Sequence, residues 1–370
     1  MIHILADQNL HKIEELVPPH VHLSLYNPTD GLPDLKQADA LLIRTVTHLN
    51  PETVPNLPDK LKFIGTGSSG TDHIDNEYFE SHGITLADAN GCNARAVAEY
   101  VMTALLLWKE DRQPAKPFGK VGVIGVGKAG SAVVNLLQNF GIECVQYDPP
   151  REKRDPDFTS ASMKEVLNCE ILTFHVPLNK KGEHPTFHWL NEQKLEGRHF
   201  KLIINAARGG VIDELALMKF YTKGFVADYV LDVWEAEPDF NTKVANHAFI
   251  ATPHIAGYSE QSKINATKII CDELAAFFDL EPAIPKYKNV SRTIDFAHIK
   301  YDLSKVLNRL HPIKEYDAAL RDLFERPDKK VLFRNLRNEW PYRFEYEYLR
   351  IRKELTDKFP ELRKLGVHPI

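Results

Sequence analysis

Three residues suited to anion binding and proton transfer follow separate apolar segments in the second half of the chain. Arg208 follows LIINAA, Glu237 follows LDVWEA, and His254 follows FIATP. A guanidinium can hold a carboxylate through two parallel hydrogen bonds, and an imidazole exchanges protons near neutral pH. A carboxylate on the other ring nitrogen would fix the tautomer and stabilise the imidazolium. These residue types would support oxidation of an alcohol carbon beside a carboxylate, or the reverse reduction, if a hydride carrier is bound.

Each of these residues also has an ordinary structural explanation. An arginine before two glycines can bind backbone carbonyls, a glutamate before proline is often a solvated turn residue, and a histidine after Thr-Pro can be a satisfied loop residue. Their combination downstream of a cofactor motif favours the chemical interpretation.

That motif is Gly125-x-Gly127-x-x-Gly130, which lies between the apolar segment VGVI and the helical pattern AGSAVVNLLQNF. Gly125 permits a tight turn, Gly127 lets a pyrophosphate approach the backbone, and Gly130 allows the helix to pack closely on the strand. The free N–H groups at the start of the helix favour the phosphate charge. The alternative is a glycine-rich turn in another α/β fold.

An acidic residue at the end of the next strand supports the cofactor interpretation. Asp148 lies about 20 residues beyond the glycines, where a carboxylate accepts hydrogen bonds from the adenosine ribose. It would repel a 2′-phosphate, although the nearby Arg151 and Arg154 weaken that preference. The sequence therefore predicts NAD as the cofactor.

The segments that must position these residues alternate between strands and helices. Strand patterns are MIHILAD, VHLSLYN, ALLIRT and KFIGTGS in the first part, then EILTFHVP, KLIINAA, YVLDVW and FIATPHI. Helical patterns occupy HKIEELV, residues 93–109 and SEQSKINATKIICDELAAFFD. Strands joined through helices predict parallel sheets, and ligands of such sheets bind beyond the carboxyl ends of the strands. We expect an α/β protein with two Rossmann-like, doubly wound sheets.

Composition limits the class of protein further. The 370 residues suggest two or three domains, and a net charge of −5 argues against a dedicated nucleic-acid binder. The four cysteines are scattered without metal-ligand spacing, so we expect reduced thiols and no metal site. Neither a secretion signal nor a membrane span is recognisable, which predicts a cytoplasmic protein. The tail from residue 291 carries an excess of basic residues, and its segment FEYEYLRIRKEL has a helical pattern with aromatics.

Six motifs resemble the D-2-hydroxyacid dehydrogenase family, in the order in which that family has them. They are IGTGSSGTDHID, GVIGVGKAG, HVPL, NAARGGVID, LDVWEAEP and TPHIAGY. The resemblance implies that Arg208, Glu237 and His254 are the catalytic residues. It also implies cofactor contacts beyond the glycines, at Lys128, Ala129, Asp148, His175, Val176, Pro177, Ala206, Ala207, Asp232 and Gly257.

The same resemblance implies substrate contacts at Thr45, Thr66 and Tyr258. Thr45 stands where the family has serine, and Val176 stands where the family often has a hydroxyl residue. Five further segments carry a narrower resemblance: IRTVTHLN, GCNARAVAEYV, YDPPR, LTFHVPL and HIAGYSEQSK. They resemble a subfamily that oxidises 4-phosphoerythronate and carries an extra dimerisation domain. Arg44, beside the expected substrate loop, is a candidate for the phosphate, and the basic tail could add cations from a partner subunit.

The family resemblance implies discontinuous domains. Residues 1–92 and 258–284 would form the substrate domain, 93–257 the NAD-binding domain, and 285–370 an α+β dimerisation domain. We expect a homodimer with a small phosphorylated hydroxy acid as substrate, and neither a nucleic-acid nor a membrane partner. Two alternatives stay open: a dehydrogenase of phosphoglycerate or glyoxylate and hydroxypyruvate, and an NAD-sensing protein without catalysis. A nucleic-acid role for the tail is a weaker alternative.

Overall fold

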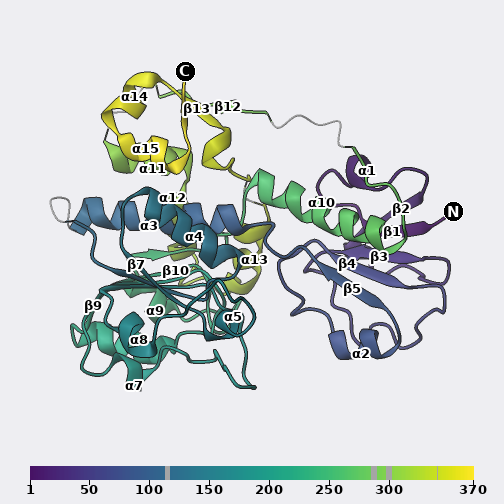
Figure 1. Ribbon diagram of the computed structural model, residues 1–370, viewed down its shortest axis with the longest axis horizontal. Coiled ribbons are helices and arrows are strands. Elements are labelled where there is room, and N and C mark those ends of the chain that lie inside the picture. The colour runs from purple at the N-terminus through teal and green to yellow at the C-terminus, as the bar shows by residue number, and fades with distance from the viewer. Residues whose placement is uncertain (113–116, 285–289, 297–301, 340) are drawn as a thin grey trace. The chain divides into compact units, whose positions relative to one another are not determined.

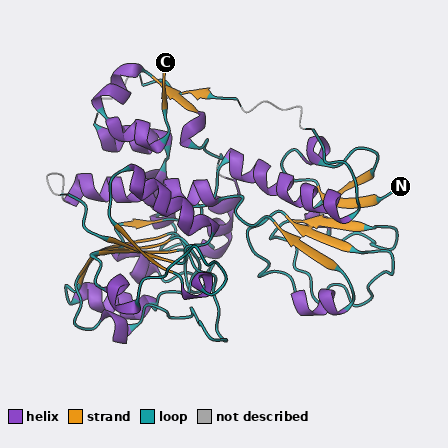
Figure 2. Cartoon of the chain, in the orientation of Figure 1, coloured by secondary structure: helices purple, strands orange, loops and turns teal. Residues whose placement is uncertain are grey.

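The computed structural model describes residues 1–112, 117–284, 290–296, 302–339 and 341–370. The chain folds into two compact units, one of residues 1–93 and 259–290, the other of residues 94–258 and 291–370. Figure 2 shows that each unit combines strands with helices. Residues 291–370, the greater part of the expected domain 285–370, belong to the same compact unit as residues 94–258. Residues 285–289, at the start of the expected dimerisation domain, lie outside the described residues.

The first unit is built on a parallel sheet of strand order β2-β1-β3-β4-β5. Its strands are β1 (His3–Asp7), β2 (His22–Tyr26), β3 (Ala40–Ile43), β4 (Phe63–Thr66) and β5 (Thr85–Asp88). Its helices are α1 (Ile13–Leu16), the 3-10 turn η1 (Pro28–Asp30), α2 (Asn76–Ser81) and α10 (Glu260–Phe277). Figure 1 labels these elements apart from η1.

Alternating side chains give this sheet two buried faces. Leu42 packs in the cluster that contains Ile270 of α10, whereas its neighbour Leu41 packs in a second cluster on the other face. The connection after β1 leads to β2 on one side of the sheet, whereas the connection after β3 leads to β4 on the other side. The residues after β1 and β3 therefore lie at a topological switch point, where such sheets bind ligands.

The second unit contains a six-stranded parallel sheet of order β11-β10-β9-β8-β6-β7. Its strands are β6 (Val121–Ile124), β7 (Cys144–Tyr147), β8 (Ile171–Phe174), β9 (Phe200–Asn205), β10 (Val226–Leu231) and β11 (Ile250–Ala251). The long helices α3 (Ala94–Arg112) and α4 (Lys128–Asn139) pack against each other on one face, and α8 (Glu214–Thr222) packs on the other. Short helices complete this part: α5 (Pro149–Glu152), α6 (Met163–Leu167), α7 (Glu192–Leu195) and α9 (Thr242–His247).

The rest of the second unit comes from the C-terminal region. Three short parallel strands, β12 (Arg292–Thr293), β13 (Leu349–Ile351) and β14 (His368–Pro369), form a small sheet. The helices are α11 (Leu303–Leu310), α12 (Ile313–Arg321), α13 (Lys329–Glu339), the 3-10 turn η2 (Tyr346–Tyr348), α14 (Lys353–Lys358) and α15 (Pro360–Leu365). The expected α/β class, with two parallel sheets and a small C-terminal sheet with helices, is confirmed.

A buried carboxylate ties this region to α3. Glu99 has no exposed side-chain surface, and it accepts hydrogen bonds from Arg343 Nη1 at 2.6 Å and from the Tyr346 backbone at 3.0 Å. The Tyr346 hydroxyl is 2.6 Å from the hydroxyl of Thr103, one helical turn further along α3. These buried polar contacts, together with apolar packing, explain why the C-terminal region is part of the second unit.

The helical interpretation of FEYEYLRIRKEL is wrong in its middle. That segment forms η2, then β13, and becomes α-helical at α14. Leu349 and Ile351 are buried while Arg350 between them is exposed, which is the period of a strand. Pairing of β13 with strands on both sides overrides the local helical pattern.

Among the described residues, no helix combines the length and the apolar character that a membrane crossing requires.

Candidate active site

The glycine turn after β6 has the geometry that its sequence predicts at two positions. Gly125 has φ +85, in the left-handed region that favours glycine, and a Cβ there would lie 2.6 Å from the His175 carbonyl oxygen. A Cβ at Gly130 would lie 1.9 Å from the Gly125 oxygen. Side chains at these two positions would push the turn away from α4 and from the segment after β8.

Gly127 differs from the other two, because among the described residues no atom outside the adjoining backbone and neighbours lies within 4 Å of a Cβ built on it. The protein leaves open the side on which a pyrophosphate would approach. Gly127 also caps α4 without a side-chain hydrogen bond, so the N–H groups of Lys128 and Ala129 begin the helix uncapped by a side chain. The residues present at this turn thus fit a bound dinucleotide.

Asp148 links the glycine turn to the end of β7. Its Oδ2 accepts the Val126 N–H at 2.7 Å, and its Oδ1 accepts the Arg151 N–H at 2.9 Å. A carboxylate has about four lone-pair positions, so these two bonds leave acceptors for ribose hydroxyls. Arg151 donates through Nη1 to the Val126 oxygen at 2.8 Å and pairs with Asp155 at 3.0 Å. A 2′-phosphate would have to compete with these contacts, so Arg151 supports the turn and does little to weaken the preference for NAD.

The HVPL segment, which follows the neighbouring strand β8, packs against the glycine turn. The His175 N–H donates to the Ile124 oxygen at 2.7 Å, and its Nε2 lies 2.9 Å from the Thr173 hydroxyl. Burial lowers the pKa of His175 to about 3, so the ring is neutral at physiological pH. The Val176 side chain lies against Gly125, where a Cβ would be 2.6 Å from Val176 Cγ1, whereas Pro177 is exposed. A neutral, fixed histidine here supports a role in shaping the cofactor turn.

His254 and Glu237 meet as a hydrogen-bonded pair. The His254 Nδ1 lies 2.8 Å from Glu237 Oε2, and Glu237 Oε1 accepts the Trp234 N–H at 2.9 Å. The carboxylate is therefore held at both oxygens, and it fixes the ring orientation with Nδ1 protonated. No hydrogen bond to His254 Nε2 occurs within the described residues, and the side chain is 24% exposed. Nε2 is the atom placed to exchange a proton with a ligand.

Electrostatics favour the ionised form of Glu237. Burial alone would raise its pKa, but the charge and hydrogen bond of His254, the Trp234 N–H and the charge of Arg337 outweigh it and lower the pKa. A charged Glu237 stabilises the imidazolium that forms when His254 takes a proton.

Asp232 shapes the loop that carries His254. Its carboxylate is fully buried and accepts hydrogen bonds from Ile255 N at 2.8 Å, Ala256 N at 2.9 Å and the Thr252 hydroxyl at 2.6 Å. Burial raises the pKa of Asp232, opposed by the charge of His254 and by these bonds. His254 has φ +60, a strained conformation for a non-glycine residue, and its N–H bonds the Asp232 carbonyl at 2.7 Å. The observed contacts of Asp232 therefore position His254, and its predicted contact with the cofactor stays a prediction.

Arg208 follows β9 in a turn that Asn205 fixes. The Asn205 amide donates to the Arg208 oxygen at 3.1 Å and accepts the Ala207 N–H at 3.1 Å. The Arg208 side chain is half-buried, and its Nη1 donates to the Ala207 oxygen at 2.9 Å. A Cβ on Gly209 would lie 1.8 Å from the Trp234 oxygen, so the loops after β9 and β10 touch. Ala206, also predicted to contact the cofactor, is half-buried in this turn.

The order of the strands brings these loops to one edge. Arg208, Glu237 and His254 follow β9, β10 and β11, which are adjacent parallel strands. The glycine turn follows β6, two strands from β9 and therefore roughly 10 Å away along the same edge. The catalytic candidates and the cofactor candidates thus share the carboxyl edge of one sheet.

The predicted substrate residues of the first unit have varied surroundings. Arg44 donates through Nε to Asp7 at 2.8 Å, and Asp7 has no exposed side-chain surface. Thr66 is fully buried, with its hydroxyl 2.9 Å from His73 Nε2 and 3.0 Å from Ser68 Oγ. Thr45 is exposed after β3. In this structure Arg44 and Thr66 serve the internal contacts of the unit, and their substrate roles stay predictions.

Tyr258, the substrate candidate of the second unit, has a partner that the sequence did not predict. Arg337 of α13 donates through Nε to the Tyr258 hydroxyl at 2.9 Å. The Tyr258 N–H bonds the Ile255 oxygen at 2.8 Å, so Gly257 lies inside a turn that starts after His254. The available signal for Arg337 was the basic excess of the tail.

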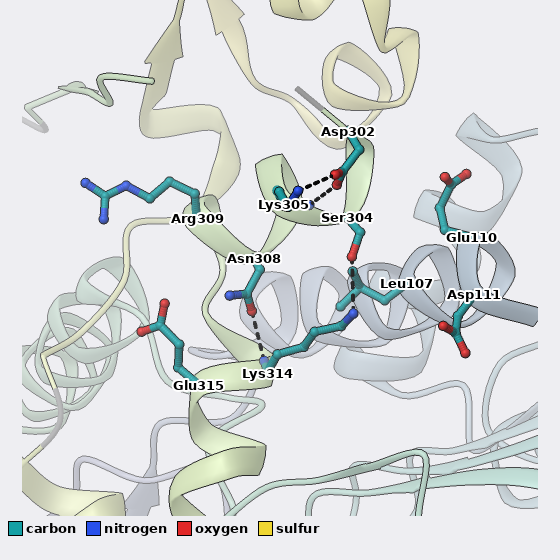
Figure 3. Close-up of a pocket in the computed structure, with 10 residues that line it drawn as sticks. All are labelled: Leu107, Glu110, Asp111, Asp302, Ser304, Lys305, Asn308, Arg309, Lys314 and Glu315. Carbon is teal, nitrogen blue, oxygen red and sulfur yellow. Dashed lines mark hydrogen bonds and ion pairs between the residues drawn. The ribbon is translucent and has the colours of Figure 1, made fainter. Parts of the chain in front are cut away.

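A separate pocket lies between the end of α3 and the helices α11 and α12 (Figure 3). Two of its charged side chains, Lys305 and Asp302, pair at 3.0 Å, and Lys314 bonds the Ser304 hydroxyl at 3.2 Å. None of the predicted site residues lines it. Within the described ranges, no group of three or more His, Cys, Asp or Glu residues has the arrangement of a metal site.

Comparisons with known proteins agree with this geometry. The model of the D-isomer specific 2-hydroxyacid dehydrogenase NAD binding domain matches residues 105–256. Solved structures of similar fold include D-lactate dehydrogenase from Aquifex aeolicus, complexed with NAD and lactic acid, at 23% identity and a TM-score of 0.58 over 75% of this chain and 95% of that one. NAD-bound 3-phosphoglycerate dehydrogenase of Entamoeba histolytica is 21% identical, with a TM-score of 0.59 over 75% and 95% of the two chains. The fold and site thus define an NAD-dependent dehydrogenase of the D-2-hydroxyacid class.

Relatives that match the chain over nearly its whole length narrow the class. Erythronate-4-phosphate dehydrogenase of Bacteroides thetaiotaomicron is 36% identical, covering 92% of this chain and 97% of the relative. The same enzyme of Salmonella arizonae is 33% identical over 99% of this chain and 98% of the relative. The chain belongs to the erythronate-4-phosphate dehydrogenase family.

Proposed function

We propose that the chain oxidises 4-phosphoerythronate to 2-oxo-3-hydroxy-4-phosphobutanoate with NAD, as a step of pyridoxal 5′-phosphate biosynthesis. The observation that carries this proposal is the 2.8 Å contact between His254 and Glu237, at the sheet edge that also holds Arg208 and the glycine turn. The names of the relatives support the choice of substrate.

The side chains divide the work as follows. Arg208 binds the substrate carboxylate and holds the neighbouring C2 hydroxyl toward His254. His254 Nε2 takes the hydroxyl proton, and Glu237 stabilises the resulting imidazolium. NAD, when bound, accepts the hydride that leaves C2. The two electrons of the C2–H bond leave with the hydride, the carbonyl forms at C2, and the proton stays on His254 until it is released to water.

A substrate screen with purified protein tests this proposal. NADH formation is followed at 340 nm with 4-phosphoerythronate, 3-phosphoglycerate and glycolate, and NADH consumption with glyoxylate and hydroxypyruvate. We expect kcat/KM to be highest for 4-phosphoerythronate. Turnover of another acid with none of 4-phosphoerythronate would refute the substrate and leave the family assignment intact.

A substitution at His254 separates catalysis from NAD sensing. We expect His254→Ala to lower kcat about 10²–10⁴-fold, the usual contribution of a general base, while NAD binding persists. His247→Ala, at an exposed histidine at the end of α9, is the matched control and should leave kcat unchanged. A natural protein without dehydrogenase activity on any of these acids would favour the sensor.

The homodimer and the cytoplasmic location remain proposals. The C-terminal region is the candidate for the dimer contact because the family resemblance implies a dimerisation domain there. Sedimentation equilibrium tests the dimer, and fractionation of cells that produce the protein tests the location.

A further inference from the structure

Helix α13 is fixed beside the loop that carries Glu237. Phe333 of α13 is buried against Phe240, with ring centroids 5.5 Å apart. Lys329 donates to the Phe240 oxygen at 3.1 Å and pairs with Asp239 at 3.1 Å, and Lys330 pairs with Asp239 at 2.9 Å. These contacts attach the helix within three residues of Glu237.

Two turns beyond its start, α13 presents Arg337 to the His254 loop. Its Nε bonds the Tyr258 hydroxyl at 2.9 Å, and its guanidinium carbon lies 5.8 Å from the centre of the Tyr258 ring. Its charge contributes to the lowered pKa of Glu237. Burial acts to lower the pKa of Arg337, but Tyr258, Glu237 and Asp232 reverse that effect and raise it. Arg337 therefore belongs to the electrostatic environment of the catalytic pair.

The hydrogen bonding of Arg337 is incomplete. A guanidinium has five N–H donors, and within the described residues the hydrogen bonds of Arg337 engage Nε alone, without an ion pair. Two arginines of the same C-terminal region that are partly or fully buried pair with a carboxylate: Arg343 with Glu99 at 2.6 Å, and Arg321 with Asp317 at 2.9 Å. A desolvated charge without a partner is costly, which favours binding of an anion at Nη1 and Nη2.

We propose that Arg337 binds the phosphate of the substrate, in the same active site where Arg208 binds the carboxylate. The proposal rests on the proposed function and adds a binding residue to it. The hydrogen bond from Arg337 Nε to the Tyr258 hydroxyl orients the guanidinium, so that Nη1 and Nη2 can donate together to two phosphate oxygens. The phosphate site would then come from the chain's own C-terminal region and need no cation from a partner subunit.

Kinetics with two substrates test this assignment. Erythronate lacks the phosphate of 4-phosphoerythronate and keeps the reacting carbon and carboxylate. With NAD saturating, we expect Arg337→Gln to raise KM for 4-phosphoerythronate about tenfold to a hundredfold, the range for lost charge-assisted hydrogen bonds. KM for erythronate should stay within about twofold, because both forms of the enzyme lack a phosphate contact to it. Arg334→Gln, at an exposed arginine one turn earlier on α13, is the matched control.

Further variants distinguish binding from folding. Arg337→Lys keeps the positive charge but loses the two parallel N–H donors of the guanidinium, so the rise in KM should be smaller than for Arg337→Gln. Tyr258→Phe keeps the ring and removes the hydroxyl that aligns Arg337. Each variant is checked for its unfolding midpoint and NAD affinity. Equal KM changes for both substrates in Arg337→Gln or Arg337→Lys, or no change for either, would overturn the proposal while the proposed function stands.

Direct binding keeps the two proposals separate. Calorimetry with inorganic phosphate, in the presence of NAD, should detect binding to the natural protein and at least tenfold weaker binding to Arg337→Gln. If the natural protein fails to turn over 4-phosphoerythronate, the proposed function fails, and this measurement still decides whether Arg337 forms a phosphate site. Equal phosphate binding by the two proteins would overturn it.

Discussion

Replacing Asp232 by asparagine tests whether a buried carboxylate sets the geometry of the catalytic loop. Its Oδ1 accepts from Ile255 N and the Thr252 hydroxyl, and its Oδ2 accepts from Ala256 N. Asparagine can reproduce the two bonds at Oδ1. At the other position its NH₂ group would face the Ala256 N–H, donor against donor, so that one buried N–H loses its acceptor.

The magnitude follows from this single lost bond. A buried donor without a partner costs about 1–3 kcal/mol, which lowers the unfolding midpoint of a unit of this size by roughly 2–12 °C. The strained φ of +60 at His254 depends on the same contacts, because its N–H and the next two N–H groups all bond Asp232. A displacement of His254 by about 1 Å would lower kcat on the order of a hundredfold.

The assay compares Asp232→Asn with a matched variant in β10, the strand that ends just before Asp232. Asp228 is also buried, but it accepts from Trp108 Nε1 at 2.9 Å and from Arg112 at 3.2 Å, in contacts with α3. Asp228→Asn should lower the unfolding midpoint and leave kcat within about twofold, whereas Asp232→Asn should lower both. A normal kcat in folded Asp232→Asn, or an equal loss in both variants, would refute the reasoning.

Three further predictions concern cofactor choice, pH and stability. Asp148→Asn should lower the ratio of kcat/KM for NAD over NADP at least about tenfold, because it removes the charge that repels a 2′-phosphate. Burial raises the pKa of Glu214 from 4.5 to about 7, so the native state binds a proton that the unfolded chain lacks in this range. Stability should therefore fall by on the order of 3 kcal/mol as pH rises from about 4.5 to about 7, and urea titrations should show this slope flattened in Glu214→Gln. Arg44→Gln leaves buried Asp7 without its cation and should lower the free energy of unfolding by about 3 kcal/mol, measured in urea.

The sequence predicted the elements that local patterns determine. Apolar runs marked β6, β8, β9, β10 and β11, and the glycine spacing marked the turn between β6 and α4. Parallel pairing then places the residue after each run at a common edge, so the approach of Glu237 to His254 follows from strand order. The hydrogen bond between them, which the residue types suggested, is present at 2.8 Å.

Contacts that depend on tertiary packing could not be predicted in this way. The substrate role of Thr66 stays a prediction, and the contact that its hydroxyl makes with His73 depends on how the following loop folds back. The cofactor contact of Asp232 also stays a prediction, and the acceptor contacts observed for it, all within residues 252–256, were not predicted. Which partners these polar side chains contact depends on the direction in which they point, and the periodicity of the sequence does not determine that direction.

The proposed role of Arg337 would give the C-terminal region a part in substrate binding beside its proposed part in assembly. A helix that served dimerisation alone would gain nothing from placing an arginine, without a carboxylate partner among the described residues, against Tyr258. Such placement removes water from the guanidinium, a cost that an anionic ligand can offset. The lysines of the same helix anchor it to Asp239, beside Glu237, so the distance between phosphate and reacting carbon would be set by one fixed helix. An enzyme with two such anion-binding arginines would discriminate among acids by the separation of their carboxylate and phosphate groups.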